Sequence, residues 1–246
     1  DGGEPLFVLD YISCGRNLPS RTADIVEGVA RACAFAGCAL LGGEISEHPG
    51  VMSDDEYDLV AFAVGVVARA KMLGPARVQQ GDVVIGLASS GLHSNGYSLV
   101  RKLILDHDLS LQSEVPRAGR TLGDELLEPC RIHAPAVRAM IDAADVHAAA
   151  HITGGGIASN LERVLPGGLG ARLDVAAWKR QPIFEYLQQI GSIPEDEMRR
   201  VFNCGLGMVI VVSRGSAHAA VEAARASGES ASIVGEITTG QGVTIG

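Results

Sequence analysis

The sequence predicts an α+β protein with two domains. Its 246 residues exceed what one small core needs, and strand-like and helix-like segments both recur along the chain. A stretch with Gly74-Pro75 and scattered charges separates an apolar strand pattern that ends at Val67 from another that begins at Val83. We therefore expect domains at residues 1–75 and 76–246.

The first domain is predicted to contain three strands and one helix. Pro19 suits the first turn of a helix, apolar residues follow at helical spacing, and Gly37 ends the pattern. The strand-like runs are Pro5–Ile12, Cys38–Leu41 and Leu59–Val67. Because the chain enters a strand almost at once, we expect it to be the remainder of a longer protein that lacks the beginning of this domain.

The second domain is predicted to alternate between strands and helices. Residues 109–121 are polar and are expected to form a loop. The predicted strands are Val83–Ala88, Ala148–Ile152, Ala171–Val175, Met208–Val212 and Ala231–Ile237. Predicted helices begin near Leu99 and Ile157 and also cover Leu122–Pro129, Pro135–Ala144, Ile183–Ile190, Pro194–Val201 and Ala217–Ala226.

The net charge, the cysteines and the length of the apolar stretches limit which partners and which cell compartment we expect for this protein. The formal net charge of −9 repels polyanions, so neither nucleic acid nor an anionic membrane is an expected partner. The five cysteines are odd in number and form no C-x-x-C pair, which is typical of reduced thiols in a cytoplasmic protein. The longest apolar stretch, Leu59–Ala70, is too short to cross a bilayer. A small anionic ligand remains compatible with this charge.

A polar, glycine-containing loop after the strand Val83–Ala88 is the central motif of the chain. The loop leads into a helix whose first backbone N–H groups have no partner within the helix, and Ser94 or Asn95 can cap only some of them. The remaining groups, together with the helix dipole, favour an anion. The predicted substrate- or phosphate-binding residues here are Ser89, Ser90, Gly91, Ser94, Asn95 and Gly96.

A second loop repeats this arrangement after the strand Ala148–Ile152. Thr153, Gly154, Gly155 and Gly156 precede a predicted helix, and they are the candidates for a second phosphate-binding loop. We expect Asn160 to lie on the exposed face of that helix. Two such loops would hold one multiply charged ligand, or two ligands that must meet.

Two histidines and one carboxylate are the candidate catalytic residues. His93 is expected to supply a hydrogen bond or a proton; its neighbours favour this role over the alternative, a loop histidine that only pins the turn. His151 stands beside the second loop. Glu44 follows Gly42-Gly43 and suits a hard cation such as Mg²⁺, but the same pattern describes a turn with a solvated glutamate. Asp10 and Asp58 are weaker metal candidates, and Asn203 is expected to form a turn.

Several common catalytic motifs are absent from the sequence. There is no G-x-x-x-x-G-K-[ST], no complete G-x-G-x-x-G, no G-x-S-x-G and no H-E-x-x-H. Walker-type nucleotide binding, a dinucleotide fold, a hydrolase elbow and a zinc protease are therefore not indicated.

Five blocks of the sequence resemble phosphoribosylformylglycinamidine cyclo-ligase, also called aminoimidazole ribonucleotide synthetase. The blocks keep the order of that family along nearly the whole chain. They are residues 4–11, Gly42-Gly43-Glu44 with residues 47–50, Ser89–Arg101, His151–Gly156 and Phe202–Met208. Two positions depart from the usual pattern, because Ile45 replaces a threonine and Cys204 replaces a frequent methionine.

The resemblance implies an ATP- and Mg²⁺-dependent ring closure in purine biosynthesis. In this reaction phosphoryl transfer activates the formyl oxygen of formylglycinamidine ribonucleotide, and an internal nitrogen closes the imidazole. The implied fold is an incomplete amino-terminal half-barrel with a mixed sheet, followed by a carboxy-terminal α/β sandwich, in a homodimer whose amino-terminal sheets pair. The rival interpretations are another ATP-using enzyme of the superfamily, such as a selenophosphate synthetase or a thiamine-phosphate kinase, and a truncated relative that binds nucleotide without turnover.

Overall fold

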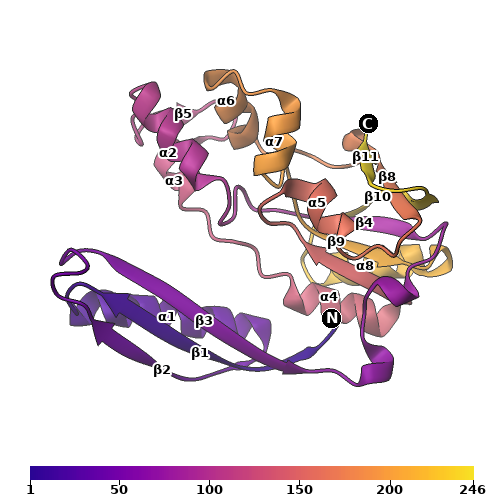
Figure 1. Ribbon diagram of the computed structural model, residues 1–246, viewed down its shortest axis with the longest axis horizontal. Coiled ribbons are helices and arrows are strands. Elements are labelled where there is room, and N and C mark those ends of the chain that lie inside the picture. The colour runs from indigo at the N-terminus through magenta and orange to yellow at the C-terminus, as the bar shows by residue number, and fades with distance from the viewer. The chain divides into compact units, whose positions relative to one another are not determined.

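A computed structural model describes residues 1–246, and the chain divides into two compact units (Figure 1). The smaller unit is Gly2–Met72, and the larger is Leu73–Gly246 together with Asp1. No helix in residues 1–246 combines the length and the apolar character that crossing a membrane requires. Each unit is described by itself below.

The smaller unit is a three-stranded mixed sheet with one long helix. Its elements are β1 (Glu4–Cys14), α1 (Pro19–Ala36), β2 (Ala39–Glu47) and β3 (Tyr57–Val66). The strand order is β2-β1-β3, with β2 parallel and β3 antiparallel to β1. As predicted, α1 has Pro19 in its first turn and ends at Gly37, which adopts the left-handed conformation with φ 77°. Strand β2 is longer than expected because it stays paired with β1 as far as Cys14 and Glu47.

Much of this sheet is apolar and uncovered within the unit. Every residue of β3 is exposed, including Phe62 at 61% of its surface. Leu41 on β2 is 65% exposed, and Leu6 and Leu9 on β1 are also exposed. Contiguous apolar surface of this kind marks an interaction site more often than a solvated face.

The larger unit is built on a six-stranded sheet with the order β11-β8-β10-β4-β9-β7. The strands are β4 (Val83–Ala88), β7 (Val146–His151), β8 (Leu169–Leu173), β9 (Leu206–Val212), β10 (Ala231–Thr239) and β11 (Val243–Ile245). The helices are α2 (Tyr97–Asp106), α3 (Leu122–Leu126), α4 (Ala134–Ala143), α5 (Gly156–Glu162), α6 (Pro182–Ile190), α7 (Glu195–Val201) and α8 (Ala217–Ala226).

Helices cover both faces of this sheet. Neighbouring residues of β4 alternate between two cores, so that Val83 and Ile85 pack with Met140 of α4 and with α8, whereas Val84 packs with α5 on the opposite face. In Figure 1, α4 and α8 lie side by side along the sheet. A third core gathers α2, α3, α6 and α7 around Phe184 and Phe202, whose ring centroids are 5.9 Å apart.

The strand register brings the two predicted loops to one edge of the sheet. Strands β4 and β7 are both antiparallel to β9, which lies between them. Ala88 at the end of β4 pairs with Leu206, and His151 at the end of β7 pairs with Met208. The loops that follow β4 and β7 therefore leave the sheet on either side of the start of β9.

Three details differ from the sequence expectations. The polar region 109–121 contains a small hairpin, β5 (Glu114–Val115) with β6 (Arg120–Thr121), and the short strand β11 was not predicted. The prediction that Ser94 or Asn95 caps α2 is wrong. The N-cap is Gly96, with φ 85° and no side-chain capping bond. A side chain at Gly96 would overlap the ring of Phe202, so the backbone turns into the helix at a glycine.

Candidate functional site

A buried asparagine shapes the first loop from beneath. The side-chain amide of Asn203 donates to the carbonyl oxygens of Gly91 at 2.8 Å and Leu92 at 3.1 Å. Its Oδ1 accepts from the hydroxyl of Ser89 and from the backbone N–H of Gly205, both at 2.9 Å. Asn203 was expected only to form a turn, but it satisfies four polar groups that the loop would otherwise bury without partners.

Two serines of the first loop are bonded to the segment Pro129–His133. The Ser90 hydroxyl donates to the carbonyl oxygen of Pro129 at 2.6 Å. The Ser94 hydroxyl lies 3.0 Å from the exposed Cys130 thiol. Ser94 is exposed and Asn95 is half-buried, so they form the outer part of this loop.

His93 is buried in the first loop, and its protonation state follows from its contacts. Its Nε2 accepts the backbone N–H groups of Ser90 at 3.1 Å and Arg131 at 3.4 Å. The ring proton is therefore on Nδ1, which is buried without a hydrogen-bond partner. Burial, followed by the positive charges of His133, His151 and Arg131, lowers the pKa of His93 to about 4. The imidazole is neutral at pH 7, so it can donate a hydrogen bond but is a poor proton donor.

Asn160 organises the second loop, contrary to the expectation that it is exposed. It is buried, and its amide donates to the carbonyl oxygens of Gly156 at 2.8 Å and of Thr153 and Gly154 at 3.3 Å. Its Oδ1 accepts from the Thr153 hydroxyl at 3.2 Å. The expectation was wrong because the Asn160 side chain points back along α5 to the carbonyl groups of the second loop, which need donors.

The second loop requires glycine and lies beside the first. Gly155 and Gly156 have φ values of 95° and 70°, and a side chain at Gly156 would overlap the carbonyl oxygen of Arg199. A Cβ at Gly154 would lie 3.7 Å from Oδ1 of Asn95 in the first loop. The structure thus brings the two predicted loops into near contact.

His151 ends β7 at the same edge and is largely exposed. Partial removal from water and the charge of His133 lower the pKa of His151. The charge of His151 also contributes to the lowered pKa of His93, so the two predicted catalytic histidines lie in one neighbourhood.

Three residues at this site were missed by sequence reasoning. Glu229 is buried and accepts hydrogen bonds from Nδ1 of His133 at 3.1 Å and from the guanidinium of Arg131 at 3.2 Å. The His133 ring is also buried, and its centroid lies 6.1 Å from that of His93. No motif connects Glu229 with Arg131 and His133, because nearly one hundred residues separate them in the chain.

Glu44 lies in the smaller unit, away in sequence from these loops. It is exposed on β2, and its carboxylate accepts the backbone N–H of Ile45 at 2.9 Å. Gly43 lets β2 approach the buried carboxylate of Asp10, since a side chain there would overlap it. No group of three or more histidine, cysteine, aspartate or glutamate side chains in residues 1–246 is arranged to hold a metal ion. A single accessible carboxylate fits Mg²⁺ that is held mainly by substrate phosphates and water, so magnesium binding by Glu44 stays a prediction.

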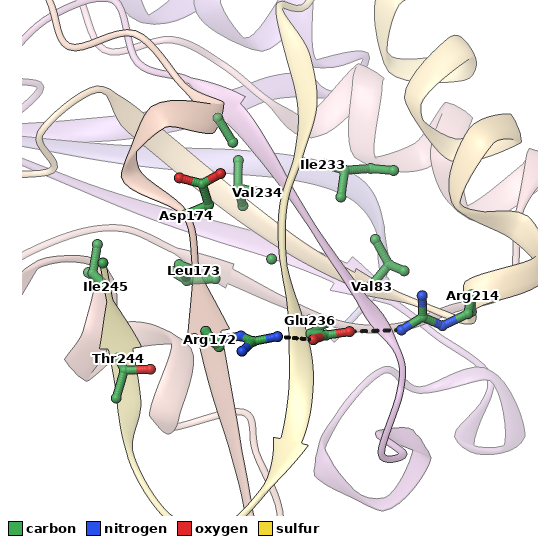
Figure 2. A pocket seen from close by; sticks show the side chains of 13 residues that line it. Val83, Arg172, Leu173, Asp174, Arg214, Ile233, Val234, Glu236, Thr244 and Ile245 are labelled. Carbon is green, nitrogen blue, oxygen red and sulfur yellow. Dashed lines mark hydrogen bonds and ion pairs between the residues drawn. The ribbon is translucent and has the colours of Figure 1, made fainter.

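Two hollows in the larger unit bear on the site. One, of about 590 Å³, lies over β8, β10 and β11 and contains none of the predicted site residues (Figure 2). There Glu236 accepts from both Arg172 at 2.7 Å and Arg214 at 2.9 Å, so these cations are already paired. The other, of about 580 Å³, borders Gly155 of the second loop together with Ser159, Arg199 and Thr244.

Known structures share this fold at low sequence identity. E. coli HypE, a hydrogenase maturation protein, matches 99% of this chain and 70% of its own with a TM-score of 0.70 and 19% identity. A thiamine-monophosphate kinase from Stenotrophomonas maltophilia gives a TM-score of 0.71 at 19% identity, covering 99% of this chain and 72% of its own. T. maritima PurL complexed with AMPPCP gives 0.59 at 17% identity, covering 99% and 36%.

Sequence comparison separates one family from these structural neighbours. The N-terminal domain of AIR synthase related proteins matches residues 1–67, and the C-terminal domain matches residues 79–246. Phosphoribosylformylglycinamidine cyclo-ligases of Bacillus cereus and Bacillus thuringiensis are each 47% identical over 244 residues, which is 99% of this chain and 70% of each relative. By this likeness over 99% of its residues, the chain belongs to the phosphoribosylformylglycinamidine cyclo-ligase family, whose members are ligases that form a C–N bond.

Proposed function

We propose that this chain takes part in the ATP-dependent cyclisation of formylglycinamidine ribonucleotide to aminoimidazole ribonucleotide in purine biosynthesis. The observation that carries the proposal is the near contact of two glycine loops at one sheet edge, between Gly154 and Asn95. The much lower identity to HypE and to thiamine-monophosphate kinase argues against the rival superfamily activities.

The larger unit, within the expected domain 76–246, would hold the phosphorylated substrate. Backbone N–H groups and hydroxyls of the first loop suit the ribose phosphate or the reacting amidine, and Thr153 to Gly156 form the second grip. Asn203 and Asn160 fix the two loops before substrate arrives, which lowers the entropy lost on binding. His93 would act through its Nδ1–H as a neutral hydrogen-bond donor.

The smaller unit, within the expected domain 1–75, would bind ATP and Mg²⁺. A solved structure with this fold was complexed with the ATP analogue AMPPCP, which supports nucleotide use. ATP supplies the phosphoryl group that activates the formyl oxygen, and Mg²⁺ neutralises the phosphates. Glu44 is the residue here that would hold the metal, by its accessible carboxylate oxygens.

The smaller unit would also form the homodimer, and the cytoplasm is the expected compartment. The exposed apolar side chains of β1, β2 and β3, such as Phe62 and Leu41, leave a sheet surface that a second copy of the chain would cover. An analytical ultracentrifugation experiment tests this, because Phe62→Glu is expected to convert dimers to monomers.

Gly154→Ala tests the proposed reaction. Gly154 is exposed and does not have positive φ, so alanine is compatible with the backbone. The new methyl group would stand between the two loops, and we expect kcat/KM for ADP release with formylglycinamidine ribonucleotide to fall by on the order of tenfold to 100-fold. The matched control is Gly167→Ala, an exposed glycine with open space around it. Equal kcat/KM for both variants, or turnover of thiamine phosphate or selenide instead, would refute the assignment.

A further inference from the structure

We propose that Glu229 is a positioning residue for the first loop, which it holds through Arg131 and His133. The proposal rests on the proposed function, because the first loop (residues 89–96) is taken as the substrate loop. Glu229 itself contacts neither loop directly, and its effect passes through the segment Pro129–His133. We call this segment the bracing segment.

The first step is the anchoring of the bracing segment by a buried charge. Only about 7% of the Glu229 side-chain surface is exposed, and its two oxygens receive the Arg131 guanidinium and the His133 ring separately. Burial alone would raise the pKa of Glu229. The hydrogen bond from His133 and the positive charges of His133 and Arg131 outweigh burial and lower that pKa. The carboxylate is therefore ionised at neutral pH and binds two residues of the bracing segment, Arg131 and His133.

The second step is the attachment of the bracing segment to the first loop. Three contacts join them: the Ser90 hydroxyl to the Pro129 carbonyl, the Ser94 hydroxyl to the Cys130 thiol, and the backbone N–H of Arg131 to Nε2 of His93. They involve three consecutive residues of the segment and three residues of the loop. A shift of the segment would therefore move the loop at several points at once.

The third step concerns the protonation of the two histidines. Because Glu229 accepts from Nδ1 of His133, that nitrogen carries a proton and the other ring nitrogen, Nε2, points away from Glu229. His93 carries its proton on Nδ1 as well, since its Nε2 accepts two N–H groups. The atoms left over, Nδ1 of His93 and Nε2 of His133, are both buried and unpartnered. Each of the two rings thus keeps one nitrogen unengaged beneath the loop.

Close packing against Gly207 holds the two rings in this arrangement. A Cβ at Gly207 would lie 2.7 Å from Cε1 of His93 and would overlap Nε2 of His133. An unpartnered buried polar atom costs about 1–3 kcal/mol. That two neighbouring rings, with centroids 6.1 Å apart, each carry such an atom points to use by a ligand or by water that accompanies it.

The test replaces the carboxylate with an amide of the same shape. For Glu229→Gln we expect KM for formylglycinamidine ribonucleotide to rise on the order of tenfold while KM for ATP stays unchanged, because the substrate loop alone is displaced. The matched control is Glu236→Gln. Like Glu229, Glu236 has two side-chain partners, in this case Arg172 and Arg214, but it lies on β10 in the hollow over β8, β10 and β11 (Figure 2). Equal values of both KM constants in the two variants would overturn the proposal.

A second readout separates this proposal from the proposed function. Ring-nitrogen NMR spectra of the folded full chain report the tautomers of His93 and His133 without any turnover. We expect Glu229→Gln to change the signals of both rings, and unchanged signals would reject the positioning role even if the chain uses another substrate. Inactivity of the wild-type chain with this substrate would count against the proposed function alone.

A shorter carboxylate covers the case in which Glu229→Gln does not fold. Glu229→Asp keeps the negative charge but retracts it by one methylene, so it is expected to show a smaller rise in KM than the amide, about threefold, and a partial change in the His133 signals. Wild-type KM values and wild-type signals in this variant would overturn the proposal.

Discussion

Three buried histidines of the larger unit, His147 on one side and His93 with His133 on the other, differ in how their ring nitrogens are bonded. His147 at the start of β7 has both ring nitrogens bonded to carboxylates, Nδ1 to Asp82 at 2.6 Å and Nε2 to Asp145 at 3.0 Å. His93 and His133, at the opposite end of the β9–β7 region of the sheet, each keep one buried nitrogen without a partner. All three rings are less than 9% exposed, so burial does not distinguish them.

The difference teaches that the partners of the ring nitrogens distinguish these histidines, whereas burial does not. Both ring nitrogens of His147 have a carboxylate partner, so this ring leaves no buried polar atom open. Arg77 is a second partner of the Asp145 carboxylate, at 2.9 Å, so the cluster of His147, Asp82 and Asp145 is closed by hydrogen bonds. His93 is neutral at pH 7, and His93 and His133 each leave one ring nitrogen open, which is the feature that the proposed site uses.

The largest expected effect concerns the hydrogen-bonded cluster of His147, Asp82 and Asp145. His147→Leu would leave the Asp82 carboxylate buried beside an apolar side chain, and we expect the free energy of unfolding to fall by about 3–5 kcal/mol. Urea denaturation measures this loss. Activity of the folded protein is expected to remain, since the cluster lies away from both loops. A loss of unfolding free energy below about 1 kcal/mol would break the comparison, because the cluster would then contribute little to stability.

The second prediction concerns how the stability of the protein depends on pH through His93, one of the two histidines with an unpartnered ring nitrogen. The pKa of His93 is lowered from 6.5 to about 4, so the unfolded chain binds a proton in this range that the folded chain does not. Stability therefore falls as the pH drops from 6.5 toward 4, at up to 1.36 kcal/mol per pH unit and about 3 kcal/mol in all.

Urea denaturation at several pH values checks this slope. His93→Asn, which tolerates the φ of 58° at this position, should flatten the slope between pH 6.5 and 4. The exposed His218→Asn serves as the control and should leave it unchanged. Parallel slopes for His93→Asn and wild type would mean that the open site has no unusual proton affinity.

The smallest expected effect on stability tests the spacing of the open pair. Gly207→Ala would push a methyl group against the His93 and His133 rings, and overpacking of this kind costs about 1–3 kcal/mol. Catalysis should suffer more than stability, because both rings would tilt. Gly215→Ala, with open space around it, is the control. Thermal unfolding measures the effect on stability, and kcat/KM measures the effect on catalysis. A loss of stability without a loss of kcat/KM would show that the His93 and His133 rings are not part of the site.

Local sequence patterns predicted most of the elements because they depend on neighbours in the chain. The helix from Pro19 to Gly37 and the helix Ala217–Ala226 follow from proline, glycine and 3.6-residue spacing. Strand β2 was predicted too short, since its second half is polar and is held only by its pairing with β1. The hairpin at Glu114–Thr121 was missed for the same reason, because its residues carry no apolar alternation.

The candidate site was predicted only in part. Both glycine loops were recognised, and the register of β4, β9 and β7 brings them to one edge. Asn160 and Asn203 were misjudged because an asparagine gives the same local signal whether it faces water or braces a distant carbonyl. Glu229, His133 and Arg131 carry no motif at all.

The sequence by itself determined the family, the order of elements and the residue types of both loops, since these are properties of neighbouring residues and of likeness to known enzymes. Only the tertiary structure decided which polar atoms find partners. Whether a buried nitrogen is bonded, as in His147, or left open, as in His93 and His133, depends on contacts between residues far apart in the chain. Hydrogen bonds need placement within a few tenths of an ångström, and only the folded backbone sets distances that fine.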